Sequence, residues 1–77
     1  MIPFNWTNLE STKIKRAKFA PNTHDERGDL LVEFSEGKVY RYKDVPVQHV
    51  EDLVHSSSPG SYFHNKIRGV YDAEQVK

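Results

Sequence analysis

The strongest constraint on the fold is an alternation of apolar and polar residues on both sides of Gly37. Its apolar and aromatic positions are Leu30, Val32, Phe34, Tyr40 and Tyr42. An apolar residue at every second position is typical of a strand with one buried face. A glycine between two such runs indicates a hairpin. We therefore expect two antiparallel strands, near residues 29–34 and 38–43.

The register of this hairpin depends on the length of its loop. A two-residue loop would place Val32 opposite Arg41 and would oppose an apolar side chain to a charged one. A three-residue loop over 35–37 places Val32 opposite Tyr40 instead, and it puts Gly37 at the left-handed position that such loops use. Because a slip of one residue would turn every side chain to the other face, we predict the three-residue loop.

Residues 12–20 predict a further strand, which precedes the hairpin. Ile14 falls on the opposite phase of a two-residue period from Ala17 and Phe19. A β-bulge near residues 15 and 16 would bring all three side chains to one face.

Two helical patterns follow the hairpin. Pro46 is well placed as the first residue of a helix, and the apolar residues of 47–54 recur at helical spacing. Ser58 before Pro59 is typical of the start of a second helix, whose apolar stripe runs over 63–71. We therefore expect an α+β domain, in which a three-stranded antiparallel meander is followed by two short helices packed on one face.

The chain is expected to form one domain over residues 9–71, with short segments at both ends. Residues 72–77 are polar, and we expect them to fray. Residues 1–8 form an arm that carries Phe4 and Trp6. This arm either folds back as an extra edge strand or forms an exposed patch for a partner protein.

The composition argues against several classes of protein. The chain has no cysteine, so it has neither a disulfide nor a thiolate nucleophile, which suits a reducing compartment. No apolar stretch approaches the roughly 20 residues of a membrane span, and the first residues do not resemble a signal peptide. We expect a cytoplasmic monomer without a cofactor and without a membrane contact.

Two spaced blocks of residues carry a resemblance to a known family. The first block is Leu30-x-Val32-x-Phe34-x-x-Gly37-x-Val39-Tyr40-x-Tyr42-x-x-Val45-Pro46, and the second is Ser58-x-Gly60-x-Tyr62-Phe63-x-x-x-Ile67-Arg68, with Ser11 upstream. Together they resemble the KTSC domain, which is named for its occurrence at the C-terminus of some lysyl-tRNA synthetases. The chain differs from the family pattern at His64, where the family has asparagine, and in a longer loop over 22–28. The resemblance implies an α+β fold and a bacterial or phage origin, and its synthetase context suggests RNA binding.

Basic residues give the main functional hypothesis. The net charge is zero, with 11 basic and 11 acidic residues, but the basic residues cluster. The candidate nucleic-acid-binding residues are Lys13, Lys15, Arg16, Lys18, Arg41 and Lys43. Arg41 and Lys43 alternate with the two tyrosines of their strand, so they point to the uncovered face of the sheet, where several cations could bind phosphates. The alternative is an ordinary solvated face, in which Glu10 and Glu33 balance the cations.

Two other features allow both a functional and a structural interpretation. Tyr40 and Tyr42 could stack on bases, but the hairpin register assigns them to the inner face and so to the core. We expect Arg68 to pair with Asp72 or to bind backbone carbonyls, which is a role in the fold.

The sequence does not support a metal site or a catalytic centre. The histidines His24, His49, His55 and His64 lack the spacing of metal ligands. The serines at 56–58 lie near His55 without the elbow motif of a nucleophile. We therefore expect no metal, no catalytic residue and no enzymatic activity.

Two functions remain open at this point. The first is a small non-catalytic module that binds nucleic acid, in particular RNA. The second is a protein-interaction module, for instance a bacterial or phage regulator that docks on a larger machine such as the transcription apparatus.

Overall fold

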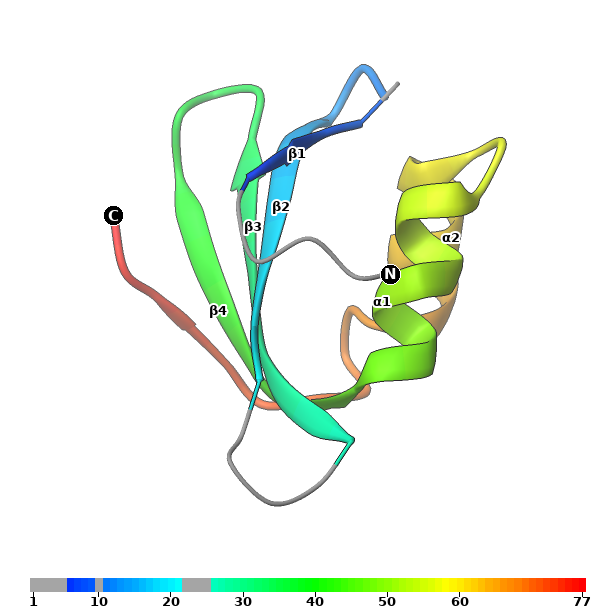
Figure 1. The fold of residues 1–77 in the computed structure, drawn as a ribbon. Helices are drawn as coiled ribbons and strands as arrows, with labels where there is room; N and C mark the ends of the chain where they lie inside the picture. The colour runs from blue at the N-terminus through cyan, green and yellow to red at the C-terminus, as the bar shows by residue number, and fades with distance from the viewer. Residues whose placement is uncertain (1–5, 10, 22–25) are drawn as a thin grey trace.

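A five-stranded antiparallel sheet carries two helices on one face (Figure 1). This computed structural model describes residues 6–9, 11–21 and 26–77. The elements are β1 (Thr7–Asn8), β2 (Ile14–Pro21), β3 (Arg27–Phe34), β4 (Val39–Pro46), α1 (Val47–His55), α2 (Pro59–Lys66) and β5 (Ala73–Gln75). The strands lie in the sheet in their sequence order, and both helices are inserted between β4 and β5. We call the sheet face away from the helices, which carries Lys18 and Arg41, the open face.

The β3–β4 hairpin has the predicted register. The predicted pairs are Leu30 with Tyr42 and Val32 with Tyr40. Gly37 has a φ of 99°, and its N–H donates a hydrogen bond of 2.9 Å to the carbonyl of Phe34. The three-residue loop with glycine at its left-handed position is therefore confirmed.

β2 contains the predicted bulge. Its register against β3 shifts between Ile14 and Arg16. Because of this shift, Ile14 and Ala17 both point to the helices, and both are buried. The bulge thus explains why the apolar residues of β2 do not follow one two-residue period.

The helices begin at or near their predicted residues. α1 begins one residue later than predicted, because Pro46 is its extended N-cap and still pairs with Arg27 in the sheet. α2 begins at Pro59 with Ser58 as its N-cap, as predicted. Neither helix in the described ranges is long and apolar enough to cross a membrane.

The core lies between the sheet and the two helices. The largest fully buried side chains are those of Ile14, Leu30, Val32, Val45, Val50, Leu53 and Ile67. The ring of Phe63 packs edge-to-face on Phe34 and Tyr42, with ring centroids 5.6 and 5.2 Å apart. Tyr42 is only 6% exposed, and the half-buried Tyr40 packs against the same core. The prediction that these tyrosines belong to the core is confirmed for Tyr42, whereas Tyr40 lies at the edge of the core.

The sheet has five strands, so the prediction of three strands is wrong. In β1, Thr7 pairs with Ala17, so this part of the arm folds back as an edge strand. β5 lies in the tail over 72–77, which we expected to fray, and the N–H of Val76 donates to the carbonyl of Val39 at 2.8 Å. Both added strands join through backbone hydrogen bonds. Such bonds need no apolar alternation, so the sequence pattern does not reveal them.

Candidate nucleic-acid interface

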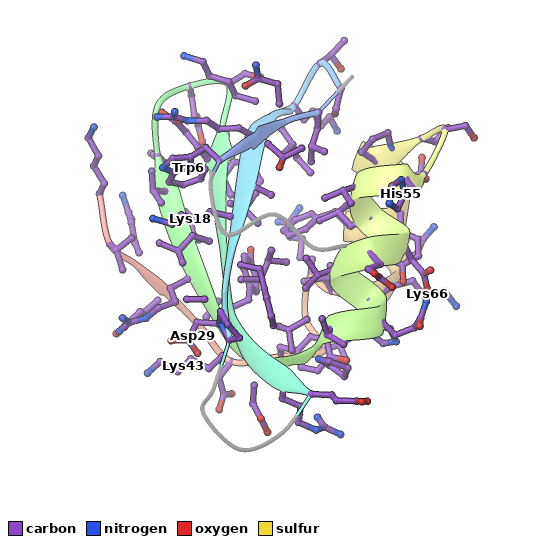
Figure 2. All side chains as sticks on the ribbon, in the orientation of Figure 1. Trp6, Lys18, Asp29, Lys43, His55 and Lys66 are labelled. Atoms are coloured by element: carbon purple, nitrogen blue, oxygen red, sulfur yellow. The ribbon has the colours of Figure 1, made fainter. Side chains whose placement is uncertain are left out.

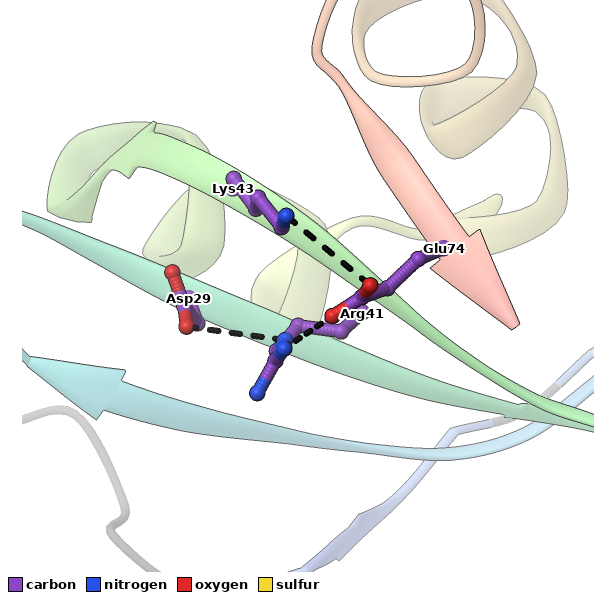
Figure 3. Close-up of polar contacts among 4 residues, drawn as sticks. All are labelled: Asp29, Arg41, Lys43 and Glu74. Carbon is purple, nitrogen blue, oxygen red and sulfur yellow. Dashed lines mark hydrogen bonds and ion pairs between the residues drawn. The ribbon is translucent and has the colours of Figure 1, made fainter. Parts of the chain in front are cut away.

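Arg41 lies in an ion-pair network on the open face (Figure 3). Its guanidinium is hydrogen-bonded to Glu74 of β5, and its Nε lies 3.8 Å from Oδ2 of Asp29 of β3. The ammonium of Lys43 lies 3.9 Å from the same Glu74. Two predicted site residues therefore meet two carboxylates, and the charge at this position is balanced.

Arg16 is also paired. Its guanidinium donates a hydrogen bond to Glu33, which is 7% exposed, and lies 4.5 Å from the ring centroid of Trp6. The hydrogen bond from Arg16 lowers the pKa of Glu33; burial acts in the opposite direction, and the charges of Lys15 and Lys77 assist the lowering. Arg16 thus interacts with both a carboxylate and an indole ring.

The remaining predicted cations, Lys13, Lys15 and Lys18, have different surroundings. Within the described part of the chain, no carboxylate oxygen lies within 4.0 Å of their ammonium groups. Lys18 lies on the open face with Trp6 (Figure 2). Lys15 lies near that face, because its charge helps to lower the pKa of Glu33. Lys13 lies at the end of the sheet and lines a groove. The structure therefore groups Lys15 and Lys18 with Arg16 and places Lys13 apart.

The predicted protein-partner patch is described only in part. Trp6 is half-buried beside Arg16, and Phe4 lies outside the described residues. The larger apolar side chains that are exposed in the described ranges are those of Val70 and Val76, and neither residue belongs to the predicted patch of Phe4 and Trp6.

A groove of about 1060 Å³ lies between α2 and the loop end of the β3–β4 hairpin. It is lined by residues 11–14, 34–36, 40, 42, 57–61, 63–65 and 68, and we call it the α2 groove. Ser35 fixes one wall: its hydroxyl donates to the carbonyl of Thr12 at 2.8 Å, and its N–H donates to the carbonyl of Lys13 at 2.9 Å.

The opposite wall of the α2 groove depends on a close approach between α2 and Ser11. A Cβ atom at Gly60 would lie 3.0 Å from the Oγ of Ser11. That oxygen accepts hydrogen bonds from the N–H groups of Lys13 and Ile14, at 3.2 and 3.3 Å. A glycine at position 60 therefore lets α2 close one end of the groove.

The histidines are not grouped for metal binding. Among the residues that the structure describes, no three His, Asp or Glu side chains could hold a metal ion together. His49 shares a hydrogen bond of 2.9 Å with the hydroxyl of Tyr71, and His55 is exposed on α1 (Figure 2). His64 lines the α2 groove, and His24 lies outside the described residues.

Comparison with known proteins identifies the family. The family model of the KTSC domain matches residues 10–71. The chain belongs to the KTSC domain family. Lysine–tRNA ligases from Nostoc sp. and Trichormus variabilis are each 34% identical to the chain over 76 residues, which are 99% of this chain. The chain spans 13% of the length of these curated relatives.

A solved structure has the same fold. The crystal structure of a KTSC domain protein from Yersinia pestis matches with a TM-score of 0.81. The match covers 95% of this chain and 97% of that one, at 20% sequence identity. The sheet with its two helices is therefore the fold of both chains.

The residues that carry the family resemblance converge in the structure. Ser11 lies far in the sequence from the second block, which holds Ser58, Gly60 and Arg68, but all four residues line the α2 groove. The ion pair that we expected between Arg68 and Asp72 is not formed among the described residues. Arg68 instead lies near Tyr42, on whose hydroxyl its charge acts. The sequence alone does not indicate this site, because only the folded chain brings Ser11 next to the second block.

Proposed function

We propose that the domain is a small non-catalytic module that binds RNA, and that the lysines in and next to β2 make its phosphate contacts. The supporting observation is that Lys13, Lys15 and Lys18 lie within six residues and have no carboxylate partner in the described ranges. When such ammonium groups bind phosphates, the nucleic acid releases condensed counterions, and this release favours binding.

The family supports RNA as the ligand. A lysine–tRNA ligase acts on an RNA, and a segment of two such enzymes is 34% identical to nearly the whole of this chain. A segment that accounts for 13% of an enzyme of this kind is consistent with an accessory RNA-binding unit.

The paired cations of the open face contribute less in this proposal. Arg16, Arg41 and Lys43 already have carboxylate partners, namely Glu33 for the first and Glu74 for the other two. A phosphate would have to compete with these carboxylates, so each contact would release less free energy than a contact from an unpaired lysine.

Two double variants with the same loss of charge test the proposal. Lys15→Gln/Lys18→Gln should weaken binding of a mixed single-stranded RNA by about 10-fold at low salt, because two phosphate contacts are lost. Lys43→Gln/Lys66→Gln also removes two positive charges, one paired with Glu74 and one on α2. This control should change the affinity far less, and fluorescence anisotropy measures both.

An equal loss of affinity in the two double variants would show that only net charge matters and would contradict the proposed contacts. If the wild type does not bind RNA even at low salt, the RNA-binding proposal is wrong. The protein-interaction module, with Trp6 and Phe4 as its candidate patch, would then be the proposal to test. The monomeric state and the cytoplasmic location expected from the sequence stay predictions.

A further inference from the structure

The α2 groove has an excess of positive charge. Lys13 and Arg68 line it together with His64, and the carboxylate among its lining residues is that of Glu36. Among the described residues, Lys13 and Arg68 have no carboxylate oxygen within 4.0 Å. Its volume, about 1060 Å³, is at the upper end of the range of small-molecule sites. An anionic ligand of limited size fits these properties.

Tyr42 brings a hydroxyl to the same groove. Its side chain is 6% exposed and lines the groove, and no hydrogen bond joins its hydroxyl to any described residue. Because this hydroxyl lines the groove and has no partner among the described residues, it can serve a ligand. Burial raises the pKa of Tyr42, although the nearby charge of Arg68 opposes the effect. The hydroxyl therefore stays protonated at neutral pH and can donate.

The first turn of α2 adds further donors. Ser58 is the N-cap, but its side chain makes no capping hydrogen bond. The first N–H groups of a helix lack partners within the helix, and residues 58–61 line the groove. Hydroxyl and amide donors of this turn therefore line the same groove as Arg68.

Aromatic rings form another part of the groove. Phe34 and Tyr40 line it, and their rings pack edge-to-face with centroids 5.7 Å apart. Tyr40 is half-buried, so part of its ring remains accessible. Bases bind to such rings by stacking, with little dependence on sequence.

We propose that the α2 groove holds one nucleotide of a bound single-stranded RNA, with its phosphate at Arg68 and the Tyr42 hydroxyl and its base beside Tyr40. This inference rests on the proposed RNA-binding function and assigns the site that positions the strand. The lysines near β2 would then hold the phosphates that extend from the groove, because Lys13, which lines the groove, is close in the sequence to Lys15 and Lys18.

The test is a titration of the ¹⁵N-labelled chain, followed by NMR, with uridine 5′-monophosphate and with a mixed single-stranded RNA hexamer. Both ligands should shift the amide signals of residues 58–61 and of Arg68. Tyr42→Phe and Arg68→Gln should each weaken binding of both ligands by roughly 5- to 10-fold, since each removes one hydrogen-bonding or charged contact. Lys66→Gln removes a positive charge from the last turn of α2, outside the groove lining; it is the matched control and should bind like the wild type.

The outcomes separate the two proposals. If the hexamer binds but shifts only signals of the open face, and Tyr42→Phe binds normally, the groove assignment is overturned while RNA binding stands. If the monophosphate binds in the groove and the hexamer does not bind, RNA binding is overturned while the groove remains a nucleotide site. Tyr42→Phe removes a single oxygen, and its own spectrum shows whether the fold is retained.

Discussion

Glu33 is a buried carboxylate on the open face, and its charge is stabilised by the hydrogen bond from Arg16. This partner lowers the pKa of Glu33 from its ordinary value of 4.5. The ionised form is thus favoured in the folded state, so its contribution to stability is complete above pH 4.5 and is lost as the pH falls below that value.

The variant Glu33→Gln should therefore make the melting temperature less sensitive to acid. Between about pH 6 and pH 3, the melting temperature of the wild type should fall more than that of Glu33→Gln. Glu36→Gln removes an exposed carboxylate from the hairpin loop and is the matched control. If Glu33→Gln follows the same pH profile as the wild type, the Arg16–Glu33 pair does not contribute to stability in the way described.

At the level of elements, the β3–β4 hairpin depends on the backbone of Gly37. Its φ of 99° disfavours any side chain, and nothing lies within 4 Å of a Cβ built at this position. A substitution therefore changes the backbone energy without adding a clash. Gly37→Val should lower the free energy of unfolding by roughly 1–2 kcal/mol.

Gly37→Asn is the matched control, because asparagine tolerates the left-handed conformation better than valine. Chemical denaturation of the two variants should show a clearly smaller loss for asparagine. Equal stability of Gly37→Val and the wild type would mean that the loop does not hold this residue at positive φ.

The sequence predicts some elements better than others, for physical reasons. The hairpin and the starts of both helices are predictable because their side chains repeat with a period that matches the element. The stripe expected over 63–71 extends beyond α2, which ends at Lys66, and Val70 of that stripe is exposed. β5 cannot be predicted in this way, because Ala73, Glu74 and Gln75 show no apolar alternation and join β4 through the backbone. The failure to predict β5 also affects the candidate site, because Glu74 of β5 supplies the carboxylate that forms ion pairs with both Arg41 and Lys43.

At the scale of the whole molecule, zero net charge hides an uneven distribution. Alternation correctly indicates which strand residues face away from the helices, such as Arg41. It does not indicate which cations meet carboxylates, because these contacts join residues from β2 to β3 and from β4 to β5. The six predicted site residues therefore divide, in the structure, into three paired cations and three lysines without a carboxylate partner in the described ranges.

The salt dependence of RNA affinity tests the central claim most directly. Each phosphate contact with a single strand contributes about −0.7 to the slope of log affinity against log salt, so three lysines predict a slope near −2. The affinity of the wild type for a mixed single-stranded RNA should then fall by roughly 20-fold between about 50 and 200 mM salt. A slope close to zero, or no binding at about 50 mM salt, would contradict an RNA-binding module that works through phosphate contacts.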